Sequence, residues 1–448
     1  MSILTEYAKE KENLCVKNDR IKAELFKEFG VKKGLRDLDG HGVLTGLTNI
    51  SHVTGFKTVD GKQVPCDGEL LYRGYDVTKM VEGSLGKKYI FEEGAYLLLF
   101  GELPTAEQLS EFENVLFQCM KLPKNFTREV IMKAPSPDIM NSMTRSILTL
   151  ASYDPQRDNL ELDNVLRQCL QLIGLFPMLA VYAYHAHNHY DNDGSMYIHR
   201  PKPNMSLAEN LLQMLRPDMK FTELEAQVLD IALLLHMEHG GGNNSTFTTR
   251  VVTSAGSDTY SAIAAAMSSL KGKKHGGANL MVMNMMDDIK KHVSDYYDKE
   301  EVGYYLDKIL NKEAFDKKGL IYGMGHAVYS LSDPREKVFK GFVEKLAKAK
   351  GRDEDMALYN NIEEMAPKII SGERKIFKGV SPNVDFYSGF VYDMLEIPRE
   401  MYTPLFAVAR IAGWSAHRME ELITDSKIIR PAYKSLVSKR EYIPRDER

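Results

Sequence analysis

Hydrophobic and polar positions follow two different spacings along this chain, and the change falls near Tyr75. Before it, short alternating runs are separated by glycines, which predicts a frayed N-terminal helix followed by a small β-rich section. We expect turns in this section at the Asp-Gly pairs 60–61 and 67–68. After Tyr75, apolar residues recur at helical spacing to the end of the chain. The pattern predicts a mainly α-helical protein with a short β-rich N-terminal section.

Short motifs mark where the helices begin. Segments 105–108 and 222–225 carry a threonine followed by Gln or Glu at the capping-box spacing. Segment 333–336, Asp-Pro-Arg-Glu, places Asp at an N-cap and Pro in the first turn. A last long helix is predicted to start at Thr403 and to run through Trp414.

The charge-rich stretch 290–378 differs from the apolar helices on either side of it. It predicts a smaller helical domain inserted into a larger one. We place the large domain at 1–275 and 387–448, and the small domain at 276–386.

Composition and charge exclude several classes of protein. The 448 residues carry a net charge of −4, with 44% hydrophobic and 27% charged residues, so nothing favours nucleic acid or an acidic membrane surface. The longest uncharged apolar stretch, Leu172–Tyr184, is broken by Pro177 and is shorter than the ~20 residues of a membrane span. The four cysteines lie far apart without CxxC spacing, which indicates reduced thiols. We expect a cytoplasmic protein.

Nucleotide-binding fingerprints are missing. Gly323 and Gly325 form a GxG, but Val328 occupies the third glycine position and no βαβ pattern surrounds it. The segment 83–87 is too short for a P-loop. These departures argue against dinucleotide- and ATP-dependent enzymes.

Histidines occur in two glycine-rich clusters. His236 and His239 share one face of a helical turn, but HMEH lacks the HExxH spacing of a metal site, so they are either core histidines or substrate contacts. His275 stands at a predicted helix start. The positive helix end disfavours imidazolium there, which suits a neutral hydrogen-bond donor to an enolate oxygen. The alternative is a turn histidine beside a lysine-rich loop.

Charged residues stand out in three further segments. Arg335, next to the flexible backbone of Gly323 and Gly325, favours an anion site at a helix start, or else is an exposed arginine after a tight turn. Asp385, between apolar and aromatic residues, is either a partly desolvated general base or an N-cap. Arg410 is the only charge between Thr403 and Ser415, and a buried arginine needs a structural acid or a substrate carboxylate.

The histidines at 185, 187 and 189 alternate in what the sequence suggests is a polar loop. We interpret them as loop or packing residues, and we expect no metal site.

These clusters, in this order, resemble the citrate synthase family. The resemblance covers nearly the whole chain after the first forty residues, and it is carried by LYRGYD, HMEHGGGNNSTFTTRVV, KKHGGANLMVMNM, GMGHAVYSLSDPR, PNVDFYSG and AVARIAGWSAHRMEE. It implies a large and a small helical domain in a homodimer. It also implies an acyltransferase of the tricarboxylic acid cycle that condenses acetyl-CoA with oxaloacetate and hydrolyses citryl-CoA.

The resemblance also implies a role for each matching residue. The catalytic residues are then His275, His326 and Asp385. Oxaloacetate is then bound by His239, Arg335, Arg410 and, from the other subunit, Arg430. No cofactor is permanently bound. Coenzyme A enters as a thioester co-substrate against Gly323, Gly325 and Lys378.

Two departures and three alternatives accompany the resemblance. Many bacterial members have arginine in place of Ala327 and an aromatic residue in place of Ser381, so the CoA contacts are expected to differ. The alternatives are a 2-methylcitrate synthase that uses propionyl-CoA, an enzyme that cleaves citrate or citryl-CoA, and an inactive binding protein on the same fold.

Overall fold

The computed structural model describes residues 3–36, 42–60, 62–326, 328–329, 331–374, 380–424 and 427–448. The chain divides into two units, residues 1–47 and 48–448. The first unit holds α1 (Ile3–Asp19), α2 (Ala23–Glu28) and the short helix η1 (Lys33–Leu35). No side chain in these three helices is buried. They therefore form without a hydrophobic core of their own.

A three-stranded antiparallel sheet opens the second unit. Its order is β1 (Ser51–Val59), β2 (Lys62–Tyr72), β3 (Tyr75–Asp76). Val59 is paired with Lys62, and Asp60 has a φ of +50°, so the predicted turn at 60–61 is confirmed for its described residue.

The predicted turn at 67–68 is wrong, because both residues lie inside β2, where the register with β1 shifts. The N–H of Gly68 donates to the carbonyl of Ser332 at 3.2 Å, and a Cβ at Gly68 would lie 2.3 Å from that oxygen. Glycine is needed here for a close approach of backbone rather than for a turn.

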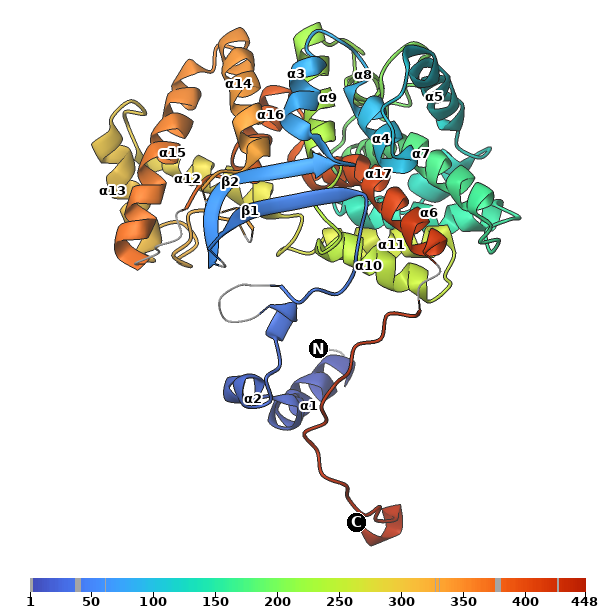
Figure 1. The fold of residues 1–448 in the computed structure, drawn as a ribbon, viewed down its shortest axis with the longest axis vertical. Coiled ribbons are helices and arrows are strands. Elements are labelled where there is room, and N and C mark those ends of the chain that lie inside the picture. Colours follow the sequence, from blue (N-terminus) through green and yellow to red (C-terminus); the bar gives the residue numbers. More distant parts are fainter. Residues whose placement is uncertain are drawn as a thin grey trace. The chain divides into compact units, whose positions relative to one another are not determined.

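Helices account for most of the second unit (Figure 1). The first group comprises α3 (Val77–Gly83), α4 (Ile90–Phe100), α5 (Ala106–Cys119), η2 (Thr127–Ile131), α6 (Ile139–Leu150), η3 (Ala151–Tyr153), α7 (Leu162–Asp191), α8 (Leu207–Leu215), α9 (Glu223–His236), α10 (Asn244–Ser254), α11 (Thr259–Leu270), η4 (Arg399–Met401) and α17 (Tyr402–Ile423). Helix α17 packs against α7, α10, α4 and α9, and it lies at the centre of this group. The tail ends in η5 (Arg445–Glu447).

A second group of helices lies together on one side in Figure 1: α12 (Ala278–His292), α13 (Lys299–Leu310), α14 (Pro334–Ala349), α15 (Asp353–Arg374) and α16 (Val384–Met394). Within it, α13 packs on α15, and α16 packs on α12 and α14. The group overlaps the small domain expected at 276–386. The domain boundaries remain a prediction, because residues 48–448 form one compact unit.

The predicted helix starts are confirmed. Capping boxes begin α5 and α9, and Asp333 caps α14 with its carboxylate 3.0 Å from the N–H of Arg335. A third capping box, Ser206 with Glu209, begins α8 and was not predicted. The last helix runs beyond Trp414 to Ile423.

The interpretation of residues 172–189 needs two corrections. Pro177 does not break the apolar stretch: α7 runs through it, because neighbouring helices bury it in the core. The three histidines lie on the last turns of this helix and not in a loop. Among the described helices, α7 alone has the length and hydropathy of a membrane span, and 78% of its most apolar window is buried inside the protein.

Candidate active site

A cavity of about 370 Å³ gathers side chains from segments far apart in the sequence. Six of the seven residues expected to react or to bind oxaloacetate line it: His239, His275, His326, Arg335, Asp385 and Arg410. Folding of the chain therefore brings together residues that were identified in separate segments of the sequence.

The pairing of two short segments places His326 beside Asp385. Residues 323–325 and 381–383 lie antiparallel and are joined by main-chain hydrogen bonds of 2.8 and 2.9 Å. His326 follows the first segment, and Asp385 follows the second in the first turn of α16. A general base and a hydrogen-bonding histidine thus enter the cavity side by side.

Both glycines of the first segment have left-handed backbone conformations, with φ of +83° at Gly323 and +81° at Gly325. A Cβ at Gly323 would lie 3.0 Å from Phe386, so this glycine lets the segment pack on α16. Gly325 lines the cavity. Lys378, the other expected CoA contact, lies outside the described residues.

Hydrogen bonds determine the tautomer of His326. Its Nδ1 accepts from the backbone N–H groups of Val328 at 3.1 Å and Tyr329 at 3.2 Å, so it carries no hydrogen. The ring stacks on Tyr329 with centroids 4.8 Å apart. The hydrogen therefore sits on Nε2, where it can be donated into the cavity.

His275 is held neutral. Burial and then the charge of Arg410 lower its pKa to about 4. Its Nε2 lies 3.1 Å from Oδ1 of Asn243 and from Oγ of Ser245. The backbone N–H of Ser245 holds that amide oxygen toward the ring, and an amide oxygen only accepts, so Nε2 carries the hydrogen in this geometry. The neutral state predicted from the helix start is present, but burial is its main cause.

Asp385 is not an N-cap, because Asn383 caps α16 by accepting from the N–H of Asp385 at 2.9 Å. Burial raises the pKa of Asp385 to about 6, against the lowering effect of Arg335 and Arg410. Within the described part of the chain, no hydrogen bond reaches its carboxylate. The group can therefore take up a proton near neutral pH.

The two arginines of the cavity differ in their partners. Arg335 is buried and is held by Asp333 through Nε at 3.0 Å and Nη2 at 2.7 Å. Arg410 is equally buried; its Nε donates to the carbonyl of His236 at 2.6 Å, and its Nη1 has no partner among the described residues. The structural acid expected for a buried arginine is thus present for Arg335, and the open donor of Arg410 suits an anion in the cavity.

The two histidines of HMEH separate in role. His236 is fully buried and stacks on Phe406, while His239 lines the cavity 5.0 Å from His326. Burial, followed by the charge of Arg335, holds the pKa of His239 well below its usual value. Its Nε2 has no hydrogen-bond partner among the residues that the structure describes.

Among the residues expected to react or to bind oxaloacetate, Arg430 does not line this cavity. It lies exposed in the tail after α17. Its expected place is in the partner subunit's site, which leaves the role a prediction.

Sequence reasoning missed several residues of the site. Asn243 and Asn383 line the cavity and position their neighbours, and Asp333 holds Arg335. Phe406 forms part of the wall. Asparagine directly before a helix is a common N-cap, and both asparagines cap helices here, so that signal was present.

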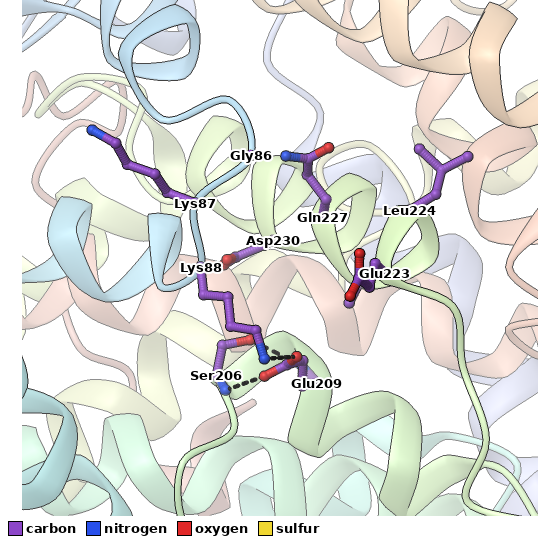
Figure 2. A pocket seen from close by; sticks show the side chains of 10 residues that line it. Gly86, Lys87, Lys88, Ser206, Glu209, Glu223, Leu224, Gln227 and Asp230 are labelled. Carbon is purple, nitrogen blue, oxygen red and sulfur yellow. Dashed lines mark hydrogen bonds and ion pairs between the residues drawn. The ribbon is translucent and has the colours of Figure 1, made fainter.

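A second polar cavity, of about 340 Å³, lies between α4, α8 and α9 (Figure 2). Three of its charged side chains have partners within the fold. Lys88 forms an ion pair with Glu209 at 2.8 Å, and Asp230 accepts from the N–H groups of Ile90 and Phe91 at 3.0 Å each. Asp230 thus caps the start of α4, and Glu209 belongs with Ser206 to the capping box of α8, so both carboxylates have structural roles.

Comparison with known proteins shows the family to which this chain belongs. The family model described as citrate synthase, C-terminal domain, matches residues 38–432. The chain is 34% identical to the citrate synthase of Synechocystis, over 87% of this chain and 88% of that protein. It is 33% identical to the 2-methylcitrate synthase of Shewanella oneidensis, over 84% of this chain and 91% of that protein.

A solved structure of citrate synthase from Thermoplasma acidophilum superposes with a TM-score of 0.75 at 29% identity, and the match covers 93% of this chain and 99% of that one. It is described as a ternary complex with carboxymethyl coenzyme A and oxaloacetate. This chain belongs to the citrate synthase family.

Proposed function

We propose that the protein is a citrate synthase, which condenses acetyl-CoA with oxaloacetate and hydrolyses citryl-CoA to citrate and CoA. One observation supports this most: a single cavity combines neutral histidines, a carboxyl group with a pKa of about 6 and two buried arginines. Buried arginines are needed to bind a dianion, and a carboxylate is needed as the base that deprotonates the carbon acid beside it.

Oxaloacetate binds through its two carboxylates. Arg410 offers an Nη1 without a described partner, and Arg335 and His239 line the same cavity. Arg430 of the second subunit completes this set in the proposed homodimer. Guanidinium groups suit the planar carboxylate, and buried cations compensate the charge that a dianion brings into a low dielectric.

Asp385 removes the proton from the methyl group of the thioester. His326 donates from Nε2 to the ketone oxygen of oxaloacetate, which becomes an alkoxide as the carbon–carbon bond forms. Donors aimed at the developing oxyanions make the weak carbon acid reactive.

His275 stabilises the thioester oxygen as the enol forms. Its hydrogen lies on Nε2 in the present geometry, held by Asn243. To donate from Nδ1, the ring exchanges its tautomer and the hydroxyl of Ser245 donates to Nε2. Substrate binding supplies the new partner that drives this exchange.

Coenzyme A lies against the glycine segment 323–325, with Lys378 as a contact to phosphate. The Thermoplasma relative, whose structure is described as a ternary complex with oxaloacetate and carboxymethyl coenzyme A, supports binding of a CoA thioester beside oxaloacetate. Binding is expected to draw the proposed small domain, 276–386, toward the rest of the chain and to exclude water from the enolate.

A 2-methylcitrate synthase is the second candidate, because relatives with that name are as similar as those named citrate synthase. No residue of the cavity decides between the two reactions. The deciding measurement is kcat/KM for acetyl-CoA and propionyl-CoA with oxaloacetate, followed as CoA release. A higher value for propionyl-CoA would replace the proposed function by this second one, and no release with either would refute both.

A further inference from the structure

Two polar side chains behind the cavity are buried without hydrogen bonds. His236 and Tyr392 are both fully buried. Neither the two ring nitrogens of His236 nor the hydroxyl of Tyr392 has a hydrogen-bond partner in the part of the chain that the structure describes. Leaving such groups unsatisfied is unfavourable, so each requires an explanation.

The two side chains, here called the buried pair, face each other. Their ring centroids lie 6.3 Å apart at an interplanar angle of 69°. Burial keeps the pKa of His236 well below its usual value and that of Tyr392 well above its own. A neutral imidazole offers one acceptor nitrogen and a phenol offers one donor, so the two groups are complementary. The two groups are not hydrogen-bonded in this structure, so a bond between them requires the side chains to shift.

The buried pair connects the two halves of the site. His236 ends α9, its carbonyl accepts from Nε of Arg410, and the chain reaches His239 three residues later. Tyr392 lies two turns after Asp385 on α16, on the same helix face. The negative charge of Asp385 contributes to the raised pKa of Tyr392, which places the two groups near one another.

The wall between the pair and the cavity can transmit a change. Phe406 lines the cavity and stacks on His236, with ring centroids 3.8 Å apart and an interplanar angle of 25°. A ligand that moves Phe406 therefore moves the imidazole. Helix α14 approaches the same ring through Phe339, 5.8 Å away, so His236 lies where the two groups of helices meet.

We propose that His236 and Tyr392 are positioning residues: when oxaloacetate binds, the Tyr392 hydroxyl donates a hydrogen bond to a ring nitrogen of His236. This bond fixes α16, with Asp385, against the segment 236–239, which carries His239 and whose first carbonyl accepts from Arg410 on α17. The proposal rests on the proposed function for its ligand. Neither residue touches the reacting atoms. The bond adds stability to the bound state alone, because the free state lacks it.

Tyr392→Phe tests the proposal, with Tyr402→Phe as a matched control. The hydroxyl of Tyr402 is also buried without a described partner, and its ring lies 5.3 Å from that of Tyr392. Tyr392→Phe should leave the melting temperature of the ligand-free protein unchanged or higher. It should reduce the increase in melting temperature that oxaloacetate causes. It should also lower kcat about three- to tenfold with KM for the acyl-CoA nearly constant. Tyr402→Phe should change neither the oxaloacetate-induced rise in melting temperature nor kcat.

Two substitutions of His236 give a readout that a purely structural role would not move. His236→Gln keeps an acceptor for the hydroxyl and should retain most of the oxaloacetate-induced stabilisation, whereas His236→Leu should lose it. Adding Tyr392→Phe to His236→Leu should reduce the oxaloacetate-induced stabilisation no further.

The outcomes separate the two proposals. If wild type condenses acyl-CoA but Tyr392→Phe behaves as Tyr402→Phe does, the pair has no positioning role and the proposed function stands. If oxaloacetate stabilises wild type more than Tyr392→Phe but no CoA is released from any thioester, the proposed function fails and the pair stands. A clear loss of ligand-free stability in Tyr392→Phe would show a partner in the free state, such as water, and would overturn the positioning role.

Discussion

Two aspartates of this protein have nearly the same pKa and different surroundings. Burial is the main reason that the pKa is raised to about 6 for both Asp385 and Asp230. The carboxylate of Asp230 accepts hydrogen bonds from the N–H groups of Ile90 and Phe91 at the start of α4. The carboxylate of Asp385 has no such bond within the described chain and opens into a cavity with two arginines. A perturbed pKa alone therefore does not identify a catalytic residue.

The hydrogen bonds make the difference between the two aspartates. Backbone donors occupy both oxygens of Asp230 and hold it in one place, so it stabilises a helix start. Asp385 keeps its oxygens available for a proton from a ligand. Four predictions, from the largest effect to the smallest, test this comparison.

The largest effect is expected for Asp385→Asn. Condensation should fall by about 10²–10⁴-fold, because a general base contributes that much, while oxaloacetate affinity should change little. The melting temperature should stay level or rise, since a buried carboxyl group without hydrogen bonds is removed. Turnover, oxaloacetate binding and calorimetric unfolding measure the three quantities. Turnover close to wild type would show that another group is the base.

The opposite pattern is expected for Asp230→Ala. The free energy of unfolding should fall by about 2–4 kcal/mol, because two hydrogen bonds to a buried charged group are lost and two backbone donors are left without partners. The kcat of the folded fraction should remain near wild type. Chemical denaturation and activity of the same sample check both quantities. A large loss of kcat with unchanged stability would reverse the assignment of the two aspartates.

The third prediction concerns pH. Only ionised Asp385 removes a proton, so kcat/KM should fall about tenfold per unit as pH drops below about 6. The contribution of the two aspartates to stability should change with pH in the opposite direction. Both carboxyl groups have folded-state pKa values above the usual 3.8, so each binds more protons in the folded state between about pH 4 and 6. The contribution of these two groups to stability therefore decreases as pH rises through this window.

The pH profiles of the two variants separate these contributions. Asp230→Ala and Asp385→Asn should each flatten the fall of stability between pH 4 and 6, and Asp230→Ala should keep the pH profile of kcat/KM. Urea denaturation at several pH values, beside initial rates, provides the data. A shifted kinetic profile in Asp230→Ala would mean that the two cavities are coupled.

The smallest effect tests the proposed contribution of a second subunit. Asp385→Asn and Arg430→Ala, each nearly inactive, are refolded together in equal amounts. In a mixed dimer, one site combines both substitutions and the other has native Asp385 with a native Arg430 from its partner. About a quarter of the wild-type activity should return. If dimers verified as mixed remain inactive, Arg430 does not act across an interface.

The sequence by itself determined the helical class, the helix starts and the identity of the reactive side chains. Capping boxes at Thr105 and Thr222 and the Asp-Pro pair at 333–334 act within one turn, so local chemistry is enough to predict them. The turn predicted at 67–68 failed because the glycine there accommodates Ser332, a contact more than two hundred residues away along the chain. Pro177 likewise lies inside α7, where packing against neighbouring helices outweighs the local cost of proline.

Only the tertiary structure decided what each reactive residue does. It separated buried His236 from His239 in the cavity, assigned Asp333 to Arg335, and set the hydrogen of His326 on Nε2. Burial, the charges that face a group and the partner of each polar atom depend on contacts between distant segments. Those contacts set the pKa values and the tautomers, and residue type and spacing along the chain do not contain them.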